Sequence, residues 1–172
     1  IIRNTKKDGR IVILIIDDSP ETLRYIISLL KSQAFNLMSL VESRQLEKLL
    51  KDVVPDLILL DLYMPDLDGI GVLRFLKRQE SYHHIPVIML TSEDEKEMLA
   101  NCLEEGAVDY LTKPVSSLEL NARVNTALRL KKQYDQIVAL KNKLNAQLEK
   151  VGEIQKQLLP QEIPTSPDYL VE

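Results

Sequence analysis

The stretch "LILLDLYMPDLDG", residues 57–69, indicates the fold class of this chain. It opens with an unbroken apolar run, LILL, and such runs are typical of strands buried on both faces of a parallel sheet. Asp61 follows the run at once, and the Met-Pro and Asp-Gly pairs after it favour a loop. The stretch therefore predicts a buried parallel strand that carries a carboxylate at its carboxyl end.

Four further apolar runs lie along the chain, of which the second is the weakest. They cover residues 11–16, 37–41, 87–90 and 107–111. Between them, apolar residues recur with a period near 3.6, which is typical of amphipathic helices. These helical segments cover residues 23–30, 46–50, 70–76 and 98–103. The alternation predicts an α/β fold, a doubly wound five-stranded parallel sheet with helices on both faces, over residues 10–125.

Composition limits the class of protein. The chain has 172 residues, 45% of them hydrophobic, and a net charge of -4 with no strongly basic half, so we expect no nucleic-acid partner. The single cysteine, Cys102, excludes a disulfide framework and is expected in a helix core. No apolar run approaches the roughly 20 residues that span a bilayer. We expect a cytoplasmic protein without a membrane partner, and we interpret the chain as a fragment with an N-terminal extension at residues 1–9.

Polar residues follow most of the predicted strands at their carboxyl ends. Asp17 and Asp18 follow the first strand and Asp61 the third, while Thr91 follows the fourth and Lys113 the fifth. In open α/β sheets the ligand binds beyond these ends. Clustered carboxylates favour Mg²⁺, and a carboxylate can attack phosphorus to give an aspartyl phosphate while a lysine and a hydroxyl bind the phosphoryl oxygens. Each residue alone could be a helix cap or a surface residue, but their joint order favours a phosphoryl-transfer site.

The chain resembles the receiver domain of two-component response regulators over about residues 10–125. The family's acceptor motif matches DLYMPDLDG, residues 61–69, and its acidic pair matches residues 17–18. Its hydroxyl position matches Thr91, and its fifth-strand signature matches GAVDYLTKP, residues 106–114. The resemblance implies a flavodoxin-like sheet with the strand order 2-1-3-4-5.

The same resemblance implies a role for each residue of the predicted site. Asp61 accepts a phosphoryl group from a histidine kinase or a phosphotransfer protein. The Mg²⁺ ligands are Asp18, Asp61 and the backbone carbonyl of Tyr63, with Asp17 acting through water. The Tyr63 ring stands at the mouth of the site, and Lys113 binds a phosphoryl oxygen.

The resemblance also implies two residues that pass on the structural change caused by phosphorylation. In the family, the hydroxyl that matches Thr91 moves toward the phosphoryl group, and the aromatic ring that matches Tyr110 moves into the vacated space. The resemblance also implies a cis peptide bond between Lys113 and Pro114. The histidine pair at residues 83–84 has no cysteine near it, and we expect it in a surface loop.

Residues 118–158 contain no proline and a single glycine, which favours one long helix from about residue 116 to 158. Apolar residues recur in this segment with the seven-residue period of a coiled coil. They are Leu130, Ile137, Leu144, Val151 and Leu158. We expect residues 126–158 to form a coiled-coil linker helix that pairs with a second copy of the chain. The alternative is a single helix that packs on a downstream domain.

The last residues resemble the entry into sporulation-type, metal-dependent serine/threonine phosphatase domains. The match is QLLP at residues 157–160, and we expect residues 159–172 to begin a truncated output domain. The chain would then be the regulatory half of a response regulator, a phosphoacceptor rather than an enzyme. Three alternatives are an adaptor with an inactive output domain, a different output such as a cyclic-dinucleotide synthase, and a free-standing phosphohydrolase. The last would need a second aspartate where Tyr63 stands.

Overall fold

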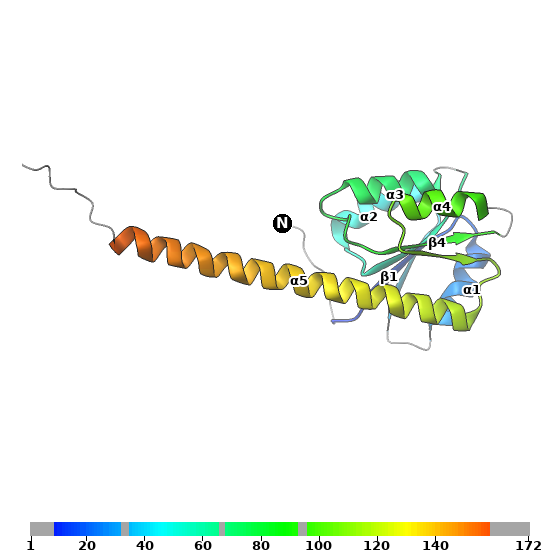
Figure 1. Ribbon diagram of the computed structural model, residues 1–172. Helices are drawn as coiled ribbons and strands as arrows, with labels where there is room; N and C mark the ends of the chain where they lie inside the picture. Colours follow the sequence, from blue (N-terminus) through cyan, green and yellow to red (C-terminus); the bar gives the residue numbers. More distant parts are fainter. Residues whose placement is uncertain (1–8, 32–34, 66–67, 93–95, 159–172) are drawn as a thin grey trace, which may run out of the picture. The chain divides into compact units, whose positions relative to one another are not determined.

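The computed structural model describes residues 9–31, 35–65, 68–92 and 96–158 (Figure 1). Strands and helices alternate along the chain, as the sequence predicts. The strands are β1 (Val12–Ile16), β2 (Asn36–Leu40), β3 (Leu57–Asp61), β4 (Val87–Thr91) and β5 (Asp109–Thr112). The helices are α1 (Pro20–Leu30), the 3₁₀ turn η1 (Ser43–Gln45), α2 (Leu46–Asp52), α3 (Gly69–Arg78), α4 (Lys96–Glu104) and α5 (Ser117–Leu158).

The five strands form one parallel sheet in the order β2-β1-β3-β4-β5, which confirms the predicted fold class and strand order. Every residue of β1, β3 and β4 is buried, because these strands have neighbours on both sides and helices on both faces. The edge strands β2 and β5 are partly exposed, and their ends differ from the predicted runs by one or two residues. An edge strand is less buried, so its hydrophobic pattern marks its ends less sharply.

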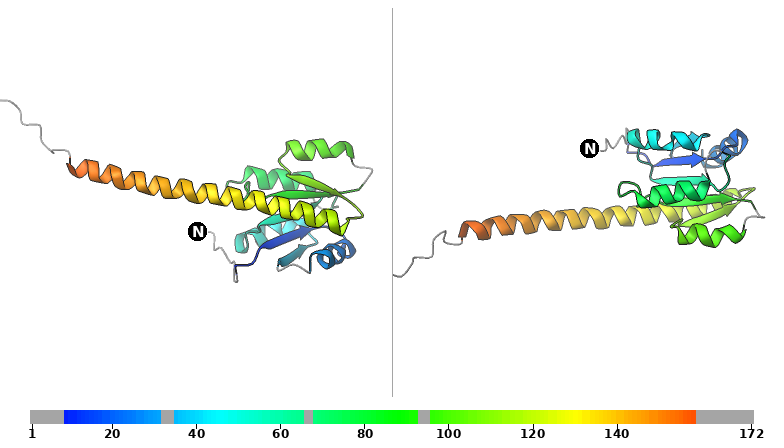
Figure 2. Two further views of the ribbon diagram at one scale, coloured as in Figure 1. Left: turned by 60° about the horizontal axis from the view of Figure 1, so that its bottom comes forward. Right: turned by 90° about the horizontal axis from the view of Figure 1, so that it is seen from above.

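Helices cover the sheet on both faces (Figures 1 and 2). On one face, α1 and the first turns of α5 contribute Ile26 and Val124 to the core. On the other face, α2, α3 and α4 contribute Leu50, Leu73 and Cys102. Cys102 is 1% exposed, so its predicted place in a helix core is confirmed, and burial raises the pKa of its thiol.

Helix α5 is continuous over 42 residues, which confirms the predicted long helix. The chain divides into two compact units, and the boundary between them lies within this helix, between Tyr134 and Asp135. In the first unit, Val124 and Ala127 of α5 are buried. In the second unit, six apolar side chains of α5 are more than half exposed, and they are Ile137, Leu140, Leu144, Leu148, Val151 and Ile154. Pairing of this helix with another one stays a prediction.

The histidine pair between α3 and β4 contacts α5. The His84 ring stacks on the Tyr134 ring with centroids 5.4 Å apart, and Nε2 of the exposed His83 lies 3.4 Å from the Tyr134 hydroxyl. Lys77 of α3 holds the same loop, because its amine donates to the backbone oxygens of His83 and Ile85. Burial lowers the pKa of Lys77 to about 8. Within the described ranges, no helix has both the length and the apolar character that crossing a bilayer requires.

Candidate functional site

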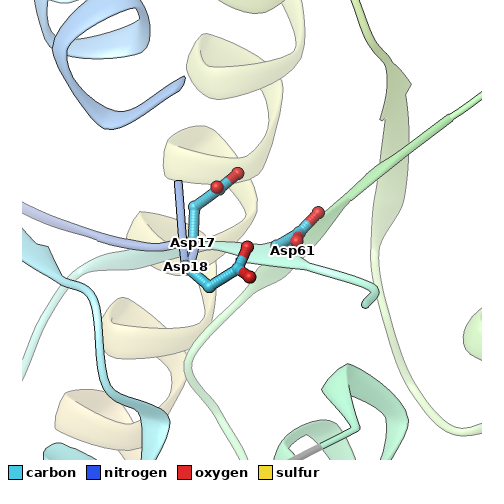
Figure 3. Close-up of side chains that lie close together, drawn as sticks. All are labelled: Asp17, Asp18 and Asp61. Carbon is cyan, nitrogen blue, oxygen red and sulfur yellow. The ribbon is translucent and has the colours of Figure 1, made fainter. Parts of the chain in front are cut away.

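Three aspartates meet at the carboxyl ends of β1 and β3 (Figure 3). Ile16 of β1 pairs with Leu60 of β3, so Asp17 and Asp61 are the next residues along two adjacent strands. Carboxylate oxygens of Asp17, Asp18 and Asp61 lie within 4.8 Å of one another. Asp17 is fully buried, Asp61 is 6% exposed, and Asp18 is exposed. Asp61 lies 43 residues after Asp18 in the sequence, and it meets the Asp17–Asp18 pair because parallel strands align their carboxyl ends at one edge of the sheet.

Lys113 reaches the same place from the end of β5. Its Nζ donates to Oδ2 of Asp17 at 2.8 Å and to Oδ1 of Asp61 at 2.6 Å. The backbone N–H of Lys113 donates to the carbonyl oxygen of Thr91 at 2.7 Å, which fixes the lysine backbone beside β4. The peptide bond between Lys113 and Pro114 is cis, as the resemblance implies.

Burial has the largest effect on the charges of this site. It raises the pKa of Asp61 to about 6, although the hydrogen bond and charge of Lys113 lower it, and the charges of Asp17 and Asp18 add to the rise. Burial alone would lower the pKa of Lys113, but its hydrogen bonds to Asp17 and Asp61 and their charges raise it overall. The lysine therefore stays charged, and among the residues that the structure describes three carboxylates gather around this one ammonium group. This excess of negative charge favours a further cation.

The donor atoms fit a hard divalent cation such as Mg²⁺. They are carboxylate oxygens from three residues, which is the oxygen chemistry that Mg²⁺ prefers. Both oxygens of Asp17 are engaged, because Oδ2 accepts from Lys113 and Oδ1 accepts from the backbone N–H of Ser19 at 2.9 Å. The exposed carboxylate of Asp18 is better placed to meet a cation that keeps part of its water shell.

Gly69 lets α3 begin directly against the end of β3. A Cβ atom on Gly69 would lie 2.2 Å from the backbone oxygen of Asp61 and 2.8 Å from that of Leu62. Asp68 caps the same helix, because its carboxylate accepts the backbone N–H of Ile70 at 3.2 Å. The Asp-Gly pair therefore supplies a helix cap and a close approach of two backbones. From the sequence, the pair predicts only a turn. The glycine at the start of a helix is the one feature of the sequence that could have indicated the close approach of α3 to β3.

Thr91 and Tyr110 lie on the same face of the sheet. Thr91 ends β4, is 1% exposed, and its hydroxyl donates to the carbonyl oxygen of Ser92 at 3.2 Å. In the register of β4 and β5, Met89 pairs with Tyr110 and Thr91 pairs with Thr112. Since residues two apart on a strand share a face, the side chains of Thr91 and Tyr110 are diagonal neighbours.

A comparison with known proteins decides the family. The family model described as "Response regulator receiver domain" matches residues 13–125. The chain belongs to the response-regulator receiver family. A phosphate regulon transcriptional regulatory protein, PhoB from Pseudomonas aeruginosa, is 40% identical over 117 residues, which are 68% of this chain and 51% of that protein.

One further relative matches a longer part of the chain, and solved receiver structures share its fold. A protein from Vibrio cholerae named "Probable cyclic di-GMP phosphodiesterase" is 34% identical over 145 residues, which are 84% of this chain and 33% of that protein. The receiver domain of the Francisella response regulator 1452 is similar with a TM-score of 0.63 at 31% identity, covering 70% of this chain and 98% of that chain. The chain thus spans about half, or less, of the length of these curated relatives.

Two aromatic residues of this receiver, Tyr63 and Tyr110, are predicted from the sequence to belong to the site. Tyr63, two residues past Asp61, is 54% exposed. The Tyr110 ring has a partner that the sequence analysis missed, because the guanidinium carbon of Arg123 lies 5.5 Å from the ring centroid. The spacing of Glu119 and Arg123 on one helix is the sequence signal at this position, and it predicts a local ion pair rather than a contact with β5.

Proposed function

We propose that this receiver accepts a phosphoryl group on Asp61 from a histidine kinase or a phosphotransfer protein and passes the change to an output domain through α5. The observation that carries this proposal is the position of Lys113, which donates to Asp17 and Asp61 while Asp18 lies alongside. The Asp61 carboxylate thus lies beside the ammonium group of Lys113 and beside the carboxylates of Asp17 and Asp18. This is the arrangement that a phosphoryl group and a divalent cation need in order to share one carboxylate.

In the transfer, an oxygen of Asp61 attacks phosphorus in line with the leaving group. The new bond joins that oxygen to phosphorus. The bond that breaks is phosphorus–nitrogen in a phosphohistidine or phosphorus–oxygen in a small acyl phosphate, and its electron pair leaves with the donor. A pKa of about 6 leaves Asp61 ionised, and therefore nucleophilic, at neutral pH and above.

Four residues would hold Mg²⁺ in this site: Asp18, Asp61 and the backbone carbonyl of Tyr63 directly, and Asp17 through water. When bound, Mg²⁺ supplies positive charge that offsets the negative charge of the phosphoryl oxygens. The engaged oxygens of Asp17 and the exposed carboxylate of Asp18 support this division of roles.

Lys113 and Thr91 would bind the new phosphoryl oxygens. The Lys113 amine already touches Oδ1 of Asp61, so it can turn to a phosphoryl oxygen on that carboxylate with little movement. The Thr91 hydroxyl would turn to another oxygen, and the Tyr110 ring on the same face would follow into the space it leaves. Because the contacts with the phosphoryl group are stronger in the state with the moved Thr91 and Tyr110 side chains, phosphorylation increases the population of that state.

The exposed apolar side of α5 supports a homodimer through residues 126–158. Ile137, Leu144 and Val151 lie seven residues apart, and each is more than half exposed. Two such helices in parallel would bury these side chains against each other. A parallel pair would also hold two receivers and two output domains in a common register, which is how a change in the receiver can reach the output.

For the output domain we favour a serine/threonine phosphatase, on the sequence QLLP at residues 157–160. Residues 159 and 160 lie outside the described residues. A second candidate is an enzyme of cyclic-dinucleotide turnover, because the match to the Vibrio cholerae protein is longer than the receiver itself. A third is an adaptor with an inactive output domain. Metal-binding aspartates in the sequence after residue 172 would support the phosphatase, and each version would act in the cytoplasm through protein partners.

Intact mass after incubation with Mg²⁺ and a small acyl phosphate tests the phosphoacceptor. One phosphoryl group should appear on the parent chain alone, and only with metal. No addition to the parent, or equal addition to Asp61→Asn, would refute the proposal. Sustained hydrolysis of a generic phosphate ester would favour a free-standing phosphohydrolase instead, which the tyrosine at position 63 argues against.

A further inference from the structure

Arg123 of α5 contacts the Tyr110 ring around the edge of the sheet. Its guanidinium carbon lies 5.5 Å from the ring centroid, within the range of a cation–π interaction. Tyr110 belongs to the edge strand β5 and packs against the core on the side of α2, α3 and α4. The buried residues of α5, such as Val124, belong to the core of the opposite face. The arginine therefore joins α5 to a ring that packs on the other side of the sheet.

Carboxylates from both elements hold Arg123 in this position. Its Nη1 donates to Oδ1 of Asp109 on β5, and its Nε and Nη2 donate to Oε1 of Glu119 on α5 at 3.0 and 2.8 Å. Oδ1 of Asp109 also accepts the backbone N–H of Tyr110 at 2.9 Å. A guanidinium group with its donors bound on two sides loses little further freedom when it packs on a ring. The ion pairs with Asp109 and Glu119 thus hold the guanidinium group where it contacts the Tyr110 ring.

These contacts stabilise one position of the Tyr110 ring over others. If the ring moves away, Arg123 keeps its hydrogen bonds to Asp109 and Glu119 but loses its attraction to the ring. A cation–π contact at a partly exposed site changes an equilibrium about two- to fivefold. Since α5 is one continuous helix from Ser117 to Leu158, the residue that restrains the ring belongs to the element that carries the exposed apolar seam.

We propose that Arg123 is a positioning residue that biases the Tyr110 ring toward the position seen here and connects it directly to α5. The proposal rests on the proposed function, in which Tyr110 moves on phosphorylation. It adds a route from the ring to the linker helix that does not pass through the sheet core. Loss of the Arg123 side chain should therefore change the ring populations before any phosphoryl group is added.

The test follows the Tyr110 ring by ¹⁹F NMR of the chain labelled with 3-fluorotyrosine, with Tyr110→Phe assigning its signal. Arg123→Gln is compared with Arg129→Gln, which removes the same charge from an exposed position of the same helix. Arg123→Gln should shift the ring populations of the unphosphorylated protein about two- to fivefold. Arg129→Gln should leave them unchanged, and both variants should take up a phosphoryl group as the parent does.

An unchanged Tyr110 signal in Arg123→Gln, or an equal change in Arg129→Gln, would overturn the proposal. If circular dichroism shows that Arg123→Gln does not fold, Arg123→Lys carries the test. Lysine keeps the charge but loses the planar fork, so a smaller shift in the same direction supports the proposal and no shift overturns it. A parent chain that takes up no phosphoryl group would contradict the proposed function, whereas the unphosphorylated comparison judges Arg123 by itself.

Discussion

Replacement of Asp61 by asparagine should stabilise the metal-free receiver at neutral pH. Burial raises the pKa of Asp61 from 3.8 to about 6, so the folded state prefers the protonated carboxyl. Because one pKa unit corresponds to about 1.4 kcal/mol, ionised Asp61 lowers the free energy of unfolding by up to about 3 kcal/mol. Asparagine has nearly the shape of the protonated carboxyl and can still accept from Lys113. The variant should therefore gain about 1–3 kcal/mol.

The gain should depend on pH in one direction. Below about pH 4 the carboxyl is protonated in both the folded and the unfolded chain, so parent and variant should be equally stable. As the pH rises, the unfolded chain loses this proton first, and the parent is destabilised relative to the variant. The difference should be complete above about pH 6, where Asp61 ionises in the folded state too.

Urea unfolding followed by circular dichroism measures this difference, since the chain has no tryptophan to report by fluorescence. Parent and Asp61→Asn are compared with a chelator between about pH 4 and pH 8. Asp18→Asn is the matched control, because Asp18 is exposed and its loss should change stability by less than about 0.5 kcal/mol. An Asp61→Asn variant that is less stable than the parent at neutral pH, or whose advantage does not change with pH, would show that ionised Asp61 does not destabilise the fold.

Three other variants test the packing, the linker and the switch. Gly69→Ala should cost about 2–4 kcal/mol in urea unfolding and reduce phosphorylation, because its methyl group would meet the backbone oxygen of Asp61. Gly71→Ala, with nothing within 4 Å of the added methyl group, should be neutral or stabilising. Leu144→Lys with Val151→Lys should give a monomer in analytical ultracentrifugation; a persistent dimer would place the interface on the receiver. Thr91→Ala should keep phosphorylation but weaken the spectral change that follows it, and equal changes in variant and parent would contradict its role.

The buried strands and the acidic edge could be predicted because they depend on local sequence and on one topological rule. An unbroken apolar run marks β1, β3 and β4, whose residues are all buried. Once the strands are parallel, the residues that follow them must meet at one edge, as Asp17 and Asp61 do. The weaker run near β2 matches its place at the edge of the sheet, where its residues are partly exposed.

Contacts between distant segments could not be predicted, because they depend on how the helices pack. Nothing local to Arg123 indicates that it reaches Tyr110 around an edge strand, and the stacking of Tyr134 on His84 joins residues fifty positions apart. The close approach at Gly69 likewise depends on where α3 begins relative to β3. Each of these contacts is set by tertiary geometry rather than by hydrophobic period.

Borohydride reduction of the phosphorylated chain tests whether Asp61 is the phosphoacceptor. Borohydride converts an aspartyl phosphate to homoserine, so peptide mass spectrometry locates the acceptor residue. Homoserine is expected at position 61 only after treatment with Mg²⁺ and a phosphodonor, and none is expected in Asp61→Asn. Homoserine at position 17 or 18, or a stable phosphoryl group on a hydroxyl or histidine side chain with position 61 unmodified, would contradict this assignment.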